Sequence, residues 1–247
     1  MKLFKSEQRY IIFGGSSGIG RSVAILLNRL GASVICVGRN SEHLNNVKLS
    51  ADFPNFLFTE QFDLEENFFS INDFMKDLKD KYGKFQGLVY SAGISPLLPL
   101  RSTDSKFLQS VFLLNYFSAI ETIRSFSDRR FNTGKGCSIV AVASIAAISC
   151  EKGQSAYAGS KAALIASLKS IARELVSKQI RVNTVSPSII HTRMLNEAPY
   201  EIIQENSYKY PLGFGKPEDV SNLIVFLLSD LSSMITGQNY IFDSAVY

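Results

Sequence analysis

The sequence predicts an α/β fold in which a doubly wound, seven-stranded parallel sheet carries helices on both faces. Two observations predict it. Short apolar runs alternate along the whole chain with segments of helical periodicity, and strands joined through helices pair in parallel. The strands are almost continuously apolar, as expected when both faces of a sheet are covered. With 247 residues and 46% hydrophobic content, the chain is long enough for one such domain over 1–247.

The N-terminal half supplies four of the expected strands. Apolar residues from Arg9 to Gly14 form the first strand, and the helical periodicity that follows over 21–30 ends at Gly31. The helix expected over 66–82 has apolar positions at Phe69, Phe74 and Leu78. The other elements expected here are strands at 33–37, 56–61 and 87–90 and a helix near 42–49.

The C-terminal half supplies three more strands. A long helix with one apolar face is expected over 104–126, and a second one from 155 to about 177. Strands are expected at 138–143, at 180–186, where Pro187 ends the run, and at 239–242, with a helix over 217–229 between the last two. The region 190–215 has only a short helical pattern near 200–205, and we interpret it as a substrate-covering lid.

Composition excludes several classes of function. The net charge of +4 comes from 26 basic and 22 acidic residues without long runs of one sign, so no nucleic-acid partner is expected. No stretch approaches the roughly 20 apolar residues of a membrane span. Three widely spaced cysteines and two distant histidines predict free thiols, a cytoplasmic location and no metal site.

The first strand runs into a glycine turn that suits a dinucleotide. The turn spans residues 14–20, Gly-Gly-Ser-Ser-Gly-Ile-Gly, and opens a helix whose free amides can meet a pyrophosphate. About twenty residues later the second strand ends at Gly38 and Arg39 with no acid, which favours NADP(H) over NAD(H) because Arg suits a 2′-phosphate. Asp63 could bind the adenine amine or cap a helix. Small residues at 91–93, Ser-Ala-Gly, allow the cofactor to pass closely.

Three side chains are expected to converge on one substrate oxygen. Tyr157 and Lys161 share a helix face, and an ammonium beside a phenol lowers the tyrosine pKa. Ser144 follows the fifth strand, where its hydroxyl faces the cleft. A fourth candidate, Asn115, lies inside a long helix, where its amide either binds structural water or holds a water that relays protons.

With these motifs in register, the sequence resembles the short-chain dehydrogenase/reductase family over its whole length, which implies a single-domain Rossmann fold. The resemblance implies Asn115, Ser144, Tyr157 and Lys161 as catalytic residues. It implies a cofactor site formed by Gly14, Ser16, Ser17, Gly18, Ile19, Gly20, Arg39, Asp63, Leu64, Ser91, Ala92, Gly93, Tyr157, Lys161, Pro187, Ile190 and Thr192. The chain departs from the family pattern at Phe13, Ser91, Ser188 and Ser244-Ala245.

The resemblance implies transfer of a hydride between a nicotinamide and a carbonyl or secondary alcohol. Pieces at 211–213 and 216–218 are most similar to bacterial 3-oxoacyl-carrier-protein reductases, which would take a thioester on an acyl carrier protein. Basic candidates for carrier docking, or simply solvated charges, are Arg129, Arg130, Lys135 and Lys178. The alternative is a reductase of a sugar, polyol or other small secondary alcohol, with Leu97, Leu98, Pro99 and the lid tyrosines as its pocket.

Two further expectations follow from the resemblance. A family member that binds nucleotide without catalysis is a third hypothesis, and the presence of Ser144, Tyr157 and Lys161 argues against it. The family pairs the helices that carry Asn115 and Tyr157 across a twofold axis, so a homodimer or homotetramer is expected.

Overall fold

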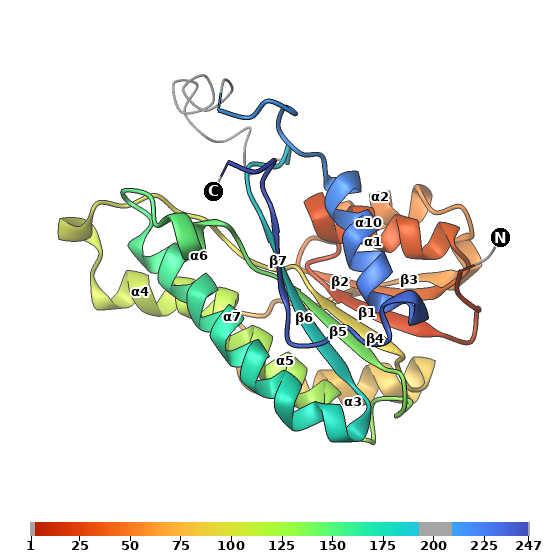
Figure 1. The fold of residues 1–247 in the computed structure, drawn as a ribbon. Helices are drawn as coiled ribbons and strands as arrows, with labels where there is room; N and C mark the ends of the chain where they lie inside the picture. The colour runs from red at the N-terminus through yellow and green to blue at the C-terminus, as the bar shows by residue number, and fades with distance from the viewer. Residues whose placement is uncertain (1–2, 193–208, 247) are drawn as a thin grey trace.

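The computed structural model describes residues 3–192 and 209–246 (Figure 1). Its sheet has seven parallel strands in the order β3-β2-β1-β4-β5-β6-β7, which confirms the predicted fold class. The strands are β1 (Arg9–Phe13), β2 (Ser33–Gly38), β3 (Leu57–Gln61), β4 (Gly87–Tyr90), β5 (Ser138–Val142), β6 (Arg181–Pro187) and β7 (Asn239–Phe242). The order reverses between β1 and β4, which is where ligands bind in open parallel sheets.

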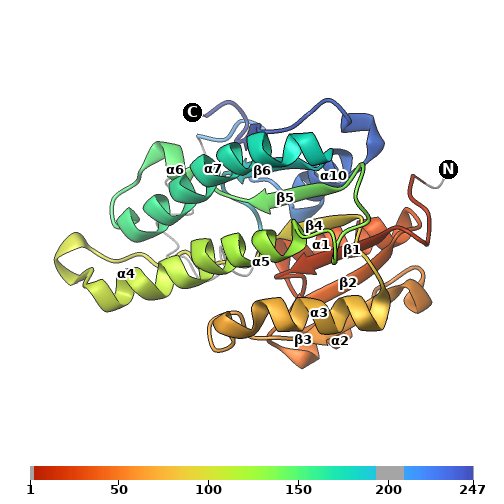
Figure 2. The ribbon, with the colours of Figure 1, turned by 90° about the horizontal axis from the view of Figure 1, so that it is seen from below.

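Helices cover both faces of the sheet (Figures 1 and 2). One face carries α1 (Gly18–Arg29), α2 (Ser41–Leu49) and α10 (Pro217–Leu228). The other carries α3 (Ile71–Tyr82), α5 (Ser118–Phe126) and α7 (Ser155–Leu175), with α4 (Ser105–Phe112) extending from α5 and the short α6 (Ala146–Ser149) before α7.

Alternation along each strand divides the core into two layers. In β1, Ile11 and Phe13 pack with the α3, α5 and α7 layer, whereas Tyr10 and Ile12 pack with the α1, α2 and α10 layer. All four side chains are buried. Successive strand residues point to opposite faces, so a strand covered on both sides needs apolar residues at every position.

Two predicted helices differ from the observed ones. The segment expected over 66–82 begins with a 3-10 turn at Phe68–Ser70 before α3, and Phe69 is 96% exposed rather than part of an apolar face. The helix expected over 104–126 is interrupted by a π turn at Leu113–Phe117. There Ser118 N donates to Leu113 O, five residues back, and the Tyr90 hydroxyl donates to the freed Leu114 O over 2.6 Å.

Part of the predicted lid, residues 193–208 with the helical pattern near 200–205, lies outside the described residues. The two ends of the region that are described lie side by side. Ile190 and Gly215 form a parallel bridge, and His191 N donates to Gly215 O over 2.8 Å. The buried Tyr210 hydrogen-bonds through its hydroxyl to Ser188, the residue after β6.

Candidate active site

The predicted site residues gather at the carboxyl ends of the central strands. Gly14 follows β1, Ser91 follows β4, Ser144 follows β5 by one residue, and Pro187 ends β6. Because all the strands are parallel, these ends meet along one edge of the sheet. The topology alone therefore brings together residues that lie far apart in the sequence.

The glycine turn is packed too closely to accept side chains. Gly14 has φ +79°, and a Cβ on it would lie 2.4 Å from Ala92 N in the turn after β4. A Cβ on Gly20 would lie 2.2 Å from the Gly14 carbonyl oxygen, which would separate α1 from the turn. The turns after β1 and β4 thus touch at the point where the strand order reverses, which is where open parallel sheets bind their ligands.

The first turn of α1 has the free donors that a pyrophosphate needs. Ser17 is the N-cap residue, and its side chain makes no capping hydrogen bond. The first amides of a helix have no partner within it, and they favour an anion. Thr192 lies against this turn, since its Cγ2 is 3.4 Å from where a Gly18 Cβ would be. These contacts fit the predicted cofactor site.

Glu65 lies at the end of the predicted cofactor site that would hold the adenosine, and the sequence did not predict this acid there. The exposed Arg39 lies after β2 with its Nη1 3.5 Å from Glu65 Oε2. Asp63 Oδ1 accepts hydrogen bonds from the backbone of Glu65 and Glu66 at 2.8 and 3.2 Å, so this carboxylate caps a turn, the second of the two roles considered for it. The neighbouring Leu64 is buried.

Ser144 and Tyr157, two of the predicted catalytic residues, lie near each other. Ser144 is buried, and its Oγ accepts a hydrogen bond from Ala146 N at 3.1 Å. Tyr157 is half-buried in the first turn of α7, and the hydroxyls of Ser144 and Ser95 lie close enough to act on its pKa, which both of them lower. Sequence reasoning missed Ser95, which lies in an irregular segment without periodicity and is four residues beyond the predicted Ser91.

The pKa of Tyr157 differs in direction from the expectation. Burial raises this pKa above its ordinary value, and the hydrogen bonds to Ser144 and Ser95 only partly oppose the effect. The expected influence of Lys161 is weak because its Nζ lies 6.0 Å from the Tyr157 ring centroid. Burial also lowers the pKa of Lys161 to about 8.

Lys161 and Asn115 both lie against the segment after β4, since a Cβ on Gly93 would be 3.3 Å from Lys161 Nζ and 3.0 Å from Asn115 Oδ1. Lys161 Nζ donates to Val142 O over 2.8 Å. Asn115 Oδ1 accepts from Ile94 N at 2.9 Å, and its Nδ2 donates to Ile94 O at 2.9 Å and to Ser160 Oγ at 3.1 Å. The buried amide is thus paired with protein groups and fixes the segment that borders the candidate site.

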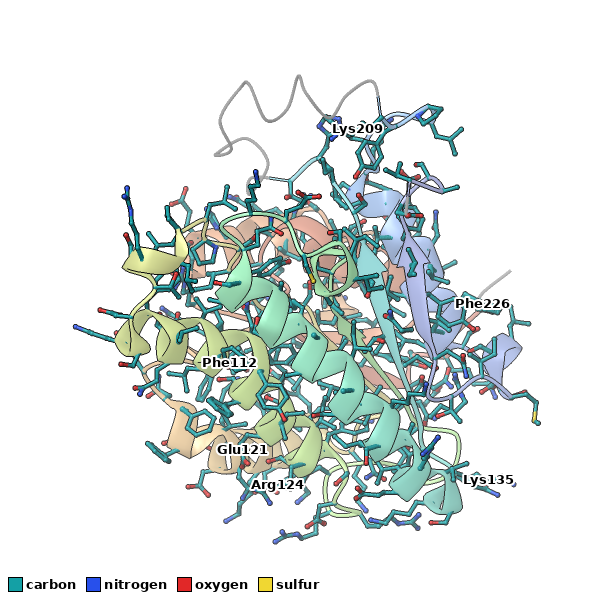
Figure 3. The ribbon with its side chains drawn as sticks, turned by 60° about the vertical axis from the view of Figure 1, so that its left-hand side comes forward. Phe112, Glu121, Arg124, Lys135, Lys209 and Phe226 are labelled. Atoms are coloured by element: carbon teal, nitrogen blue, oxygen red, sulfur yellow. The ribbon has the colours of Figure 1, made fainter. Side chains whose placement is uncertain are left out.

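The predicted basic docking residues lie at the other edge of the sheet. Arg129 and Arg130 follow α5, and Lys135 and Lys178 precede β5 and β6, so all four are at the amino ends of strands. Figure 3 shows Lys135 at the opposite end of the molecule from Lys209. Within one chain these residues do not border the candidate site, because a segment before a parallel strand lies opposite the segment after it.

Among residues 3–192 and 209–246, no helix has the length and apolar character needed to cross a membrane. The same residues contain no group of three or more His, Cys, Asp or Glu side chains arranged to hold a metal ion.

The chain has a Rossmann-like parallel sheet, and the residues predicted for cofactor binding and catalysis gather at one edge of it. Comparison with known proteins identifies its family. The profile of the family described as enoyl-(acyl carrier protein) reductase matches residues 14–245, and the chain belongs to the short-chain dehydrogenase/reductase family. Members of this family act on alcohol and carbonyl groups with a nicotinamide cofactor.

Relatives of known name match over nearly the full chain. The 3-oxoacyl-(acyl-carrier-protein) reductase FabG of Rickettsia conorii is 37% identical over 241 residues, covering 92% of this chain and 92% of that protein. FabG of Thermotoga maritima is 34% identical over 233 residues, covering 92% and 93%. A short-chain dehydrogenase/reductase structure from Brucella melitensis, named glucose/ribitol dehydrogenase, superposes with a TM-score of 0.92 at 26% identity, covering 100% and 99%.

Proposed function

We propose that this protein is an NADP(H)-dependent reductase of 3-oxoacyl thioesters carried by an acyl carrier protein. One observation carries the proposal: Ser144 lies close enough to Tyr157 to lower its pKa, and Lys161 Nζ lies 6.0 Å from the Tyr157 ring centroid, in a chain 34–37% identical to two proteins of that name. A carbonyl oxygen that enters this position gains two hydroxyl donors at once. Two donors aimed at a developing oxyanion are the usual means of stabilising it.

The mechanism assigns a role to each side chain. A bound reduced nicotinamide supplies the hydride. Tyr157 protonates the oxygen of the substrate as it becomes an alkoxide, while Ser144 donates a hydrogen bond to the same oxygen. The raised pKa keeps Tyr157 protonated near neutral pH, as a proton donor requires. Lys161 would bind the nicotinamide ribose. Asn115, whose amide is paired with Ile94 and Ser160, would hold the segment that borders the site rather than a water.

Arg39 is the residue proposed to select NADP(H). Its guanidinium is exposed after β2 and can bind a phosphate bidentately. Its pair with Glu65 is long and solvated, so a 2′-phosphate can displace it at little cost. Ser17, Leu64 and Pro187 complete the proposed cofactor site together with the glycine turn.

A sugar or polyol reductase is the second candidate. The Brucella melitensis structure favours it, because a protein named glucose/ribitol dehydrogenase overlies the whole chain. Leu97 and Leu100, 47% and 79% exposed on the segment after β4, would then contact the substrate. Under either candidate, we propose that the region 190–215 covers the site as a lid within a single domain.

Assembly into a homodimer or homotetramer is also part of the proposal. Phe112, Tyr116 and Phe117 form an aromatic cluster on α4 and the π turn, with Phe117 45% exposed. Figure 3 shows Phe112 near α7, and a Cβ on Gly159 would lie 3.6 Å from its ring. Light scattering coupled to size-exclusion chromatography measures the mass; a monomer at micromolar concentration would contradict this part.

Cofactor and substrate are tested in sequence. NADPH and NADH are titrated against the purified protein by cofactor fluorescence, and turnover is then measured with acetoacetyl and crotonyl thioesters, simple ketones and sugars. Tight NADPH binding with reduction of the acetoacetyl but not the crotonyl thioester is expected. Turnover of sugars alone would favour the second candidate, and absence of cofactor binding would contradict both.

Tyr157→Phe tests the proposed proton donor. The substitution removes the hydroxyl and keeps the ring, so we expect unchanged NADPH affinity and a loss of turnover by a factor of about 10²–10⁴. The comparison uses the same thioester at saturating cofactor. Near-normal turnover in this variant would refute the assignment of Tyr157.

A further inference from the structure

The segment from Pro187 to Thr192 joins two parts of the candidate site. At one end, Pro187 O accepts a hydrogen bond over 3.0 Å from Ile145 N, in the residue after Ser144. At the other end, Thr192 Cγ2 is 3.4 Å from where a Cβ on Gly18 would be. The segment therefore extends from the candidate catalytic serine to the turn proposed for the pyrophosphate, and it borders the place proposed for the nicotinamide half of the cofactor.

Backbone hydrogen bonds attach this segment to two other parts of the chain. Ser188 N donates to Phe242 O in β7 over 2.9 Å. Gly215 uses both of its backbone groups: its amide donates to Ile189 O over 3.1 Å, and its carbonyl accepts from His191 N over 2.8 Å. The segment is thus tied to the last strand and to the residues before α10.

One pair of side chains adds to this attachment. The hydroxyls of Ser188 and Tyr210 hydrogen-bond to each other. Tyr210 is only 6% exposed, and its ring lies edge-on to that of Phe214 with the centroids 5.4 Å apart. Gly213 N donates to Tyr210 O over 2.8 Å, which closes a turn at this residue. A buried ring in a closed turn has little freedom, so its hydroxyl holds Ser188 in one place.

We propose that Tyr210 is a positioning residue for the cofactor, which acts through Ser188 by holding the segment 187–192 where it borders the nicotinamide half. The inference rests on the proposed function, in which NADP(H) is the ligand of this site. Ser188 is one of the positions at which the sequence departs from the family pattern. The pair with Tyr210 is therefore not a contact that the family resemblance implies.

Loss of this hydroxyl pair would weaken the cofactor through a change in the free protein. The segment would spend part of its time away from the position that the cofactor needs. The apparent affinity falls in proportion to the fraction of the protein that remains competent to bind. One hydrogen bond changes such an equilibrium by up to roughly tenfold. Because Ser188 is half-buried, water can replace its partner, and the stability of the whole fold should change little.

The test compares two ligands by isothermal titration calorimetry. NADPH would fill the whole site, whereas adenosine 2′,5′-bisphosphate would fill only the adenosine end near Arg39. Tyr210→Phe is expected to weaken NADPH binding by roughly two- to tenfold and to leave the binding of the bisphosphate unchanged. Tyr240→Phe, which alters a half-buried tyrosine of β7, is the matched control and should change the binding of neither ligand.

Variants at Ser188 test the pair from its other side. Ser188→Ala should weaken NADPH as Tyr210→Phe does, and the double variant should bind no more weakly than either single variant, because both remove the same bond. Ser188→Thr keeps a hydroxyl and should retain the wild-type affinity. Hydrogen exchange without ligand gives a second measurement, in which the His191 and Gly215 amides should exchange several-fold faster in Tyr210→Phe than in Tyr240→Phe.

Three results would overturn the inference. Unchanged NADPH affinity in Tyr210→Phe would show that the pair does not position the cofactor. Equal weakening of NADPH and the bisphosphate would make Tyr210 a residue of general structural importance. Unchanged exchange at both amides would show that the pair does not hold the segment. A wild type that binds neither ligand would instead refute the proposed function and the inference with it, whereas binding without thioester reduction leaves these measurements decisive.

Discussion

Tyr90→Phe tests whether one hydroxyl stabilises the π turn that carries Asn115. Tyr90 is fully buried, and its hydroxyl donates to Leu114 O over 2.6 Å. That carbonyl needs the donor because Ser118 N bonds to Leu113 O instead. Leaving a buried carbonyl unpaired costs about 1–3 kcal/mol, and for a chain of this size the loss lowers Tm by roughly 2–10 °C.

The same change should reduce activity. Without Tyr90, the turn can satisfy Leu114 O by returning to α-helical bonding, which rotates Asn115 by about 100° relative to the residues that follow. The amide then no longer meets both polar groups of Ile94. We expect a lower kcat with unchanged NADPH affinity, measured by steady-state reduction beside thermal unfolding.

Tyr116→Phe is the control for this experiment. Its hydroxyl, in the same turn, pairs with Ser167 Oγ at 2.9 Å, but the pair is only partly buried and water can replace the lost partner. Its Tm and kcat should stay close to wild type. The reasoning is refuted if Tyr90→Phe is as stable and as active as Tyr116→Phe.

Three other predictions follow from the site. Burial lowers the Lys161 pKa to about 8, so between pH 8 and 10.5 the unfolded chain binds more protons than the folded chain. The free energy of unfolding of wild type should therefore rise with pH through this window relative to Lys161→Met. Denaturant titrations should show a gain of up to roughly 3 kcal/mol. Arg39→Ala should weaken NADPH but not NADH binding, with Tm unchanged, because its pair with Glu65 is exposed. Gly93→Ala should lower both kcat and Tm, since the added methyl displaces Lys161 Nζ and Asn115 Oδ1 and the buried Asn115 amide then loses hydrogen bonds to Ile94; an unchanged kcat would contradict it.

The fold was predictable because its signal is distributed along the chain. The central strands β1, β2, β4 and β5 are largely apolar on both faces, as Ile11 and Ile12 are in β1, and no single residue decides the pattern. The π turn was not predictable, because one extra residue inside a helix leaves Val111 and Leu114 buried as a regular helix would. The hydroxyl that bonds to its Leu114 carbonyl belongs to Tyr90, which is distant in sequence.

The sequence predicts the features of the site that depend on the spacing of residues. It does not predict the features that depend on how deeply a side chain is buried. The four-residue interval between Tyr157 and Lys161 places both on one face of α7. The direction of the Tyr157 pKa depends on how far burial outweighs charge, and the sequence contains no measure of that balance. Ser95 and Glu65 lie in irregular segments, where only the folded chain shows their neighbours.

The packing of α1 against α10 has a consequence for biosynthesis. Ser22 Oγ in α1 donates to Ser221 Oγ in α10 over 3.1 Å, and Val23, Ala24 and Leu27 share a core with Val220 and Ile224. The apolar side of α1 is thus covered by a helix whose contacting serine lies 199 residues later in the sequence. Until residues 217–228 have been synthesised, that side of α1 lacks its partner. The core on this face of the sheet is therefore expected to close only after α10 has emerged.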